Sequence, residues 1–131
     1  MKVLALDFGS ARTGVAVSDP TGTVARPLTT VEGATTDAGF ARLPDVIAGE
    51  EPALVVVGLP LTLRGERGEQ ARETEAFVEA LTAVTDVPVV TFDERFTTDL
   101  AEQVPSETAT DARAAAHLLT TYLTWSSGAP A

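Results

Sequence analysis

A lone carboxylate ends the first apolar run of the chain. Asp7 follows residues 3–6, which are all apolar, and a glycine-rich turn that carries Arg12 separates it from a second apolar run. An aspartate within such a run is costly to bury unless it is paired or binds a metal ion, and the glycines let a ligand approach the backbone closely. The pattern predicts that Asp7 holds a divalent metal against a phosphate. The alternative is that Asp7 only caps the turn.

A second charged group follows a later strand. Asp93, Glu94 and Arg95 come directly after residues 87–92, which we expect to form a strand. Successive strand residues point to opposite faces of a sheet, so Asp93 and Glu94 cannot both face one metal unless the strand has ended. We interpret Glu94 as the ligand, oriented by Asp93 or Arg95. The alternative is a charged surface turn.

A third carboxylate stands at the start of the last predicted helix. As an N-cap, Asp111 would stabilise that helix by about 1 kcal/mol. The functional interpretation turns its carboxylate toward the other acids. Asp111 can do both only in part, because an oxygen committed to the cap is less available to a metal.

Four arginines are candidates for phosphate contacts. Arg64 and Arg67 lie in a loop that follows an apolar run ending before Gly58, and ligands bind at such strand ends in open α/β sheets. Gly58 would allow close backbone approach, and a guanidinium can meet two phosphate oxygens. Arg12 and Arg95 complete the set. The alternative for the loop is a positively charged surface without a ligand.

Hydrophobic periodicity predicts the elements that position these residues. Three strands in a meander are followed by helix, strand, helix, strand and helix, which gives an α/β fold with a mixed five-stranded sheet: three antiparallel strands plus two parallel ones, flanked by helices. Pro27 suits an edge strand or a bulge, and Pro44 indicates a kink or a late helix start. We expect one domain over residues 1–131, with a flexible tail at 126–131. The expected strands cover residues 2–8, 13–18, 24–31, 53–57 and 87–92, and the expected helices 36–49, 69–84 and 110–125.

Composition narrows the chemistry further. The chain has no cysteine, one methionine and one histidine, so a resident metal should be oxygen-ligated, meaning Mg²⁺ or Mn²⁺. No signal peptide or membrane-spanning run is visible, and we expect a cytoplasmic protein without membrane contact. The net charge of −10 is unusual for a nucleic-acid binder, which normally carries basic excess. Arginines placed locally can still form a basic stripe.

Taken together, these motifs resemble the YqgF/RuvX family of small RNase H-like nucleases, described as Holliday junction resolvases or pre-16S ribosomal RNA nucleases. The resemblance covers about residues 3–123. It implies an RNase H-like fold and a catalytic, metal-binding trio of Asp7, Glu94 and Asp111. The segment at 99–110 departs from the family because it is short and has no basic residue. The motifs are residues 5–9 with Arg12, Gly14, Ala16, Ser18 and Asp19; residues 25–28; residues 57–61 with Gly65; residues 93–98; and Asp111 with Ala114, Ala115, Leu118, Leu119 and Tyr122.

The resemblance implies a metal-dependent nuclease that hydrolyses phosphodiester bonds with two metal ions. It would process the 5′ end of pre-16S ribosomal RNA, within a pre-ribosomal particle, or cleave branched DNA; the sequence leaves RNA against DNA open, and monomer against homodimer. One alternative is a nucleotide-binding module, because the Asp7 turn resembles that of actin-like ATPases, although the chain is too short for their second lobe. Another is a non-catalytic regulatory protein of ribosome maturation or transcription.

Overall fold

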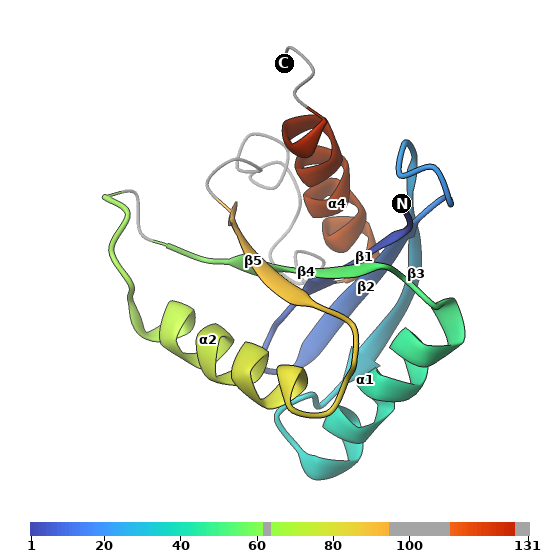
Figure 1. Cartoon of the computed structure of the whole chain (residues 1–131). Helices are drawn as coiled ribbons and strands as arrows, with labels where there is room; N and C mark the ends of the chain where they lie inside the picture. The colour runs from blue at the N-terminus through green and yellow to red at the C-terminus, as the bar shows by residue number, and fades with distance from the viewer. Residues whose placement is uncertain (62–63, 95–110, 128–131) are drawn as a thin grey trace.

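The structure is a computed structural model that describes residues 1–61, 64–94 and 111–127. Along the chain, three strands precede the first helix, and the remaining helices and strands alternate (Figure 1). The elements are β1 (Val3–Asp7), β2 (Arg12–Ser18), β3 (Ala25–Glu32), α1 (Asp37–Glu50), β4 (Leu54–Leu59), α2 (Glu69–Thr82), β5 (Val89–Asp93) and α4 (Ala112–Ser126).

The strands form one five-stranded sheet in the order β3-β2-β1-β4-β5. β1 pairs with β2 and β2 with β3 in antiparallel fashion, whereas β4 runs parallel to both β1 and β5. The predicted fold class, a mixed sheet with three antiparallel and two parallel strands, is confirmed. β1, β4 and β5 run in the same direction, so their carboxyl ends meet at one edge of the sheet (Figure 1).

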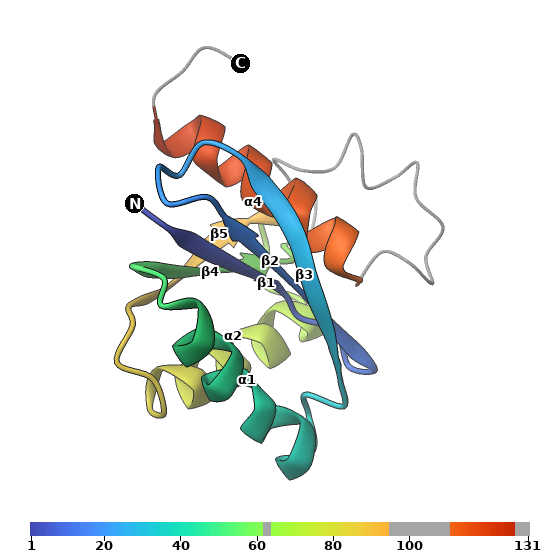
Figure 2. The same cartoon turned by 90° about the vertical axis from the view of Figure 1, so that its right-hand side faces the viewer.

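Helices cover both faces of the sheet. Figure 2 shows α4 on one side of the strands and α1 with α2 on the other. The alternation of β1 serves both layers: Leu4 and Leu6 pack in a core with residues of α1 and α2, while Val3 and Ala5 pack against α4. Asp7 continues the second series, so the strand periodicity directs its side chain to the face that α4 covers.

The predictions made at Pro27 and Pro44 fared differently. Pro27 lies in the edge strand β3, where the register with β2 shifts between Val15 and Ala16, as expected of a bulge. The late helix start at Pro44 was wrong, because Pro44 lies inside α1, which begins at Asp37. The hydroxyl of Thr36 accepts a hydrogen bond from the Gly39 N–H at 3.2 Å and caps this helix, so the chain starts it two turns before the proline.

The last helix begins and ends near the expected positions. Asp111 is its N-cap, and the helix runs to Ser126 with Ser127 as the C-cap. The first two residues of the predicted tail therefore belong to the helix end, and residues 128–131 lie outside the described part. Among the described residues, no helix combines the length and apolar character needed to cross a membrane.

Candidate active site

The carboxyl groups of Asp7 and Glu94 meet at the carboxyl edge of the parallel strands. Asp7 is the last residue of β1, and Glu94 comes immediately after β5. A hydrogen bond joins the two side chains. Because β4 lies between β1 and β5, the Glu94 side chain must cross β4 to reach Asp7.

Gly58 of β4 provides the space for this crossing. A Cβ atom built on Gly58 would overlap the Glu94 carboxylate and lie 2.8 Å from its Cγ. The sequence predicted close approach to the backbone at Gly58, and in the structure the side chain of Glu94 makes such an approach. Asp93 ends β5 opposite Leu59, so the strand has ended before Glu94 and the two acids need not share its alternation.

Burial and mutual repulsion oppose the ionisation of both carboxyl groups. The pKa of Asp7 is raised to about 9. The main cause is burial, followed by the charge of Glu94 and the hydrogen bond with Glu94. Burial also raises the pKa of Glu94, although the hydrogen bond from Asp7 acts in the opposite direction. These directions place the proton on Asp7, which donates it to Glu94. Full ionisation of the pair is therefore unfavourable in the protein without a bound cation.

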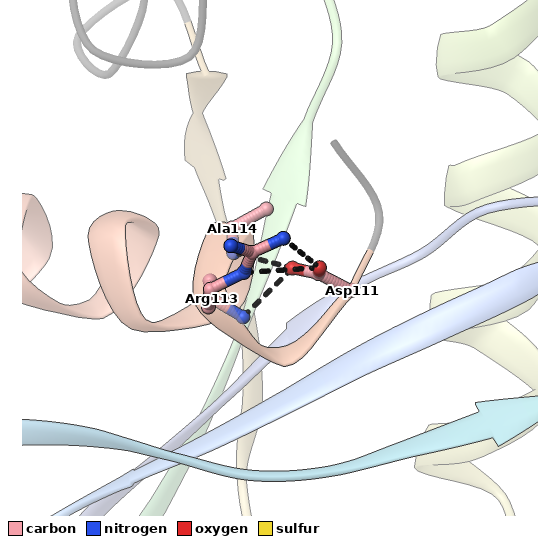
Figure 3. A network of polar contacts seen from close by, with 3 residues as sticks. All are labelled: Asp111, Arg113 and Ala114. Carbon is pink, nitrogen blue, oxygen red and sulfur yellow. Dashed lines mark hydrogen bonds and ion pairs between the residues drawn. The ribbon is translucent and has the colours of Figure 1, made fainter. Parts of the chain in front are cut away.

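Asp111 uses its two carboxylate oxygens for different partners (Figure 3). Oδ1 accepts the backbone N–H groups of Arg113 at 2.9 Å and Ala114 at 3.3 Å, which caps α4. Oδ2 accepts two hydrogen bonds from the Arg113 guanidinium, one from Nε at 3.2 Å and one from Nη2 at 3.0 Å. Partial burial raises the pKa of Asp111, but the hydrogen bonds from Arg113 and Ala114 outweigh it and leave the pKa below its ordinary value.

Gly14 lets the start of α4 lie directly on β2. It is the register partner of Asp7, and a Cβ atom there would overlap the backbone carbonyl of Asp111. Asp111 is consequently close enough to Asp7 for its charge to contribute to the raised pKa of that residue. Even so, no group of three acids or histidines within residues 1–61, 64–94 and 111–127 is arranged to hold a metal ion. The structure brings Asp7 and Glu94 together and leaves Asp111 turned to Arg113.

The described arginines predicted to bind phosphate come from two separate segments of the chain. Arg12 opens β2 and is half-buried, and Arg64 is exposed in the turn that precedes α2. Arg67 donates from Nε to Glu75 of α2 at 2.9 Å. Arg95 and the acidic segment at 99–110 lie outside the described residues.

Sequence reasoning missed two residues that shape the site. Gly14 appeared only as part of a motif, although its position two residues after Arg12, in a strand next to Asp7, was a usable signal. Arg113 was not considered at all. An arginine two residues after an N-cap aspartate has the reach to return to that carboxylate, so the spacing could have indicated the pair.

The chain has recognisable relatives. Residues 1–125 match the family model described as RuvX: Holliday junction resolvase. A Chloroflexus aggregans protein named "Putative pre-16S rRNA nuclease" is 46% identical over 102 residues, which cover 78% of this chain and 72% of that protein. One of the same name from Sulfurihydrogenibium sp. is 41% identical, covering 93% of this chain and 89% of its own.

A solved structure has the same fold. RuvC of T. thermophilus, in complex with a Holliday junction substrate, matches with a TM-score of 0.63 at 20% sequence identity, over 98% of this chain and 97% of that one. A second structure of Thermus thermophilus RuvC matches with a TM-score of 0.60. The RNase H-like fold expected from the sequence motifs is thereby confirmed.

Proposed function

This chain belongs to the RuvX family, and from that premise we propose that it is a metal-dependent nuclease in which Asp7, Glu94 and Asp111 hold the metal. The observation that carries the proposal is the buried pair of Asp7 and Glu94 at the carboxyl edge of the sheet. Two buried acids in contact are unfavourable for folding. Their presence therefore indicates a function that needs negative charge at this position. Such clusters of perturbed carboxyl groups are typical of functional sites.

The residues fit a hard divalent cation. The donors are carboxylate oxygens, which Mg²⁺ and Mn²⁺ prefer, and a cation would neutralise the repulsion that raises the pKa of Asp7 beside Glu94. Asp111 becomes a third ligand once its Oδ2 leaves Arg113. Divalent cations held in such a site would supply positive charge for the attacking and leaving oxygens of a phosphodiester displacement.

The protein's own side chains have defined tasks in this scheme. Asp7 would hold a cation as a carboxylate and would give up its proton to solvent, while Glu94, placed over Gly58, would keep its carboxylate beside Asp7. Asp111 supplies charge from the helix side of the site. Arg12, Arg64, Arg67 and Arg95 are proposed to contact substrate phosphates, and Arg67 must then exchange Glu75 for a phosphate.

We propose structured RNA as the substrate, namely the 5′ region of pre-16S ribosomal RNA in a cytoplasmic pre-ribosomal particle. The support is the name shared by relatives that are 41–46% identical to this chain. The description of the matching family favours a four-way DNA junction instead. The two substrates can be compared directly in one assay.

The test is cleavage by the purified chain and by Asp7→Asn. Each protein is incubated with Mn²⁺ or Mg²⁺ and either a structured RNA that contains the 16S 5′ leader or a four-way DNA junction. We expect the wild type to cleave the RNA, chelator to stop cleavage, and Asp7→Asn to be inactive with an unchanged circular dichroism spectrum, because asparagine has no charge to hold a cation. Cleavage by Asp7→Asn at the wild-type rate, or by the wild type in chelator, would contradict the proposal.

A further inference from the structure

The Arg113 side chain binds the carboxylate oxygen of Asp111 that does not take part in the helix cap. Its Nε and Nη2 atoms both point at Oδ2, at 3.2 and 3.0 Å, while Oδ1 is bound by two backbone N–H groups (Figure 3). These four hydrogen bonds of the carboxylate are all internal to the first turn of α4. A cation can gain Asp111 as a ligand only if one of these contacts is broken.

The contact with Arg113 is the one that should break. The cap satisfies two backbone donors that have no other partner within the helix, and losing it would destabilise α4. The ion pair instead joins Asp111 to an arginine whose side chain is 65% exposed, and exposed ion pairs contribute little to stability. A cation that takes Oδ2 therefore releases Arg113 without disturbing the helix.

The released guanidinium has the chemistry to bind phosphate. Nε and Nη2 form the planar fork that meets two oxygens of a carboxylate or a phosphate, and they cannot serve both acceptors at once. Arg113 is paired at 3.0 Å with one of the three acids that we propose to hold the cation. In a chain of net charge −10, few other cations are available for this purpose.

We propose that Arg113 is a phosphate-binding residue that becomes available only when a divalent cation displaces it from Asp111. The inference rests on the proposed function in one respect, the role of Asp111 as a metal ligand. It makes the cation and the nucleic acid bind cooperatively, since each takes one partner of the same ion pair, and the coupling must act equally in both directions.

The first experiment measures metal affinity without any substrate. Mn²⁺ is titrated calorimetrically into the wild type, Arg113→Ala, Arg113→Lys and the control Lys2→Gln. Lys2 pairs with Glu50 at 3.2 Å, next to the opposite end of β1 from Asp7, so Lys2→Gln removes a paired cation far from the site. We expect Arg113→Ala to bind Mn²⁺ about two- to fivefold more tightly than Lys2→Gln, because no competitor remains on Oδ2. Arg113→Lys, with the charge but no fork, should lie between them.

The second experiment asks whether the freed arginine binds phosphate. The affinity of a fluorescent structured RNA is measured against salt in Ca²⁺ and in EDTA, and a gel verifies that the RNA stays intact. In Ca²⁺ we expect Arg113→Ala to weaken binding and to reduce the slope of log affinity against log salt by about 0.7–0.9, the value of one lost phosphate contact. In EDTA, where Arg113 stays on Asp111, the variant should match the wild type.

Each outcome identifies which proposal fails. Equal Mn²⁺ affinity for Arg113→Ala and Lys2→Gln, or the same loss of RNA affinity with and without Ca²⁺, would overturn the role of Arg113. A wild type that binds Mn²⁺ but cleaves nothing would overturn the nuclease proposal alone, because the metal titration does not depend on cleavage.

Discussion

At the scale of single residues, the buried position of Asp7 favours the protonated form of its side chain. The side chain ends an apolar strand, and burial together with Glu94 makes its ionisation unfavourable in the metal-free protein. Its pKa rises from 3.8 to about 9 on folding, so the folded chain binds more protons than the unfolded chain between these values. The contribution of Asp7 to stability is therefore fully present below about pH 4 and is lost as the pH rises toward 9.

Asp7→Asn should remove this dependence on pH. Asparagine can donate to Glu94 as protonated Asp7 does, but it does not titrate. In EDTA we expect the variant to melt about 5 °C or more above the wild type at pH 8, with a smaller difference at pH 5, as measured by thermal unfolding. Asp45→Asn, which removes an exposed carboxylate of α1, serves as the control for charge. A difference that narrows as the pH rises would contradict the assignment of the raised pKa to Asp7.

The types of residues along the chain were enough to choose candidate acids, but not to predict the contacts that those acids make. Asp7, Glu94 and Asp111 could be selected because each interrupts an apolar pattern or starts a helix, and the conflict between capping and metal binding at Asp111 follows from its position. Which partner takes the remaining oxygen depends on side-chain conformation, so Arg113 was not foreseen. For the same reason, the ion pair of Arg67 with Glu75, eight residues later along the chain, was not foreseen.

At the scale of elements, two glycines set how closely neighbouring segments approach at the site. Gly14 of β2 lies under the Asp111 carbonyl at the start of α4, and Gly58 of β4 lies under the Glu94 side chain that arrives from β5. The site is thus built by strand and helix ends that meet over positions without a Cβ atom. Any side chain at these positions would separate the acids that the sheet edge brings together.

Gly58→Ala should impair the site while leaving the sheet intact. The added Cβ would lie 2.8 Å from Glu94 Cγ, so Glu94 must move away from Asp7. We expect cleavage to fall by about tenfold to hundredfold, because a displacement of about 1 Å has that effect on catalytic geometry, and we expect weaker Mn²⁺ binding by calorimetry. The matched control is Gly49→Ala in α1, where a Cβ meets no atom within 4 Å. It should keep full activity and gain about 0.5–1 kcal/mol of stability. Equal activity in the two variants would count against Glu94 as a ligand.

The sequence predicted the elements well because their signals are local. Short apolar runs gave all five strands, and their order in the chain indicated which pairs are antiparallel and which are parallel. The errors arose where tertiary packing overrides a local preference. Pro44 lies inside α1 because Leu43 and Ile47 on either side of it are buried in the core, which offsets the hydrogen bond that proline cannot donate.

At the scale of the whole molecule, charge limits how this protein can hold a nucleic acid. With nineteen acidic and nine basic residues, the chain as a whole repels phosphate, and attraction must come from a few arginines near the site and from bound cations. Each phosphate neutralised by a side chain contributes about 0.9 to the slope of log affinity against log salt for a duplex and about 0.7 for a single strand. The slope therefore counts the arginines that take part.

We expect a shallow salt dependence for RNA binding in Ca²⁺. Arg12, Arg64, Arg67, Arg95 and Arg113 together allow a slope of about −4 at most in magnitude, which can be measured by fluorescence anisotropy over a range of KCl. Exposed arginines that we place outside the site, Arg26 of β3 and Arg42 of α1, should leave the slope unchanged when replaced by glutamine. A slope near −8 would require almost all nine basic residues to contact phosphate. That outcome would mean that the nucleic acid wraps around the molecule, and the carboxylate edge would no longer be the place where substrate binds.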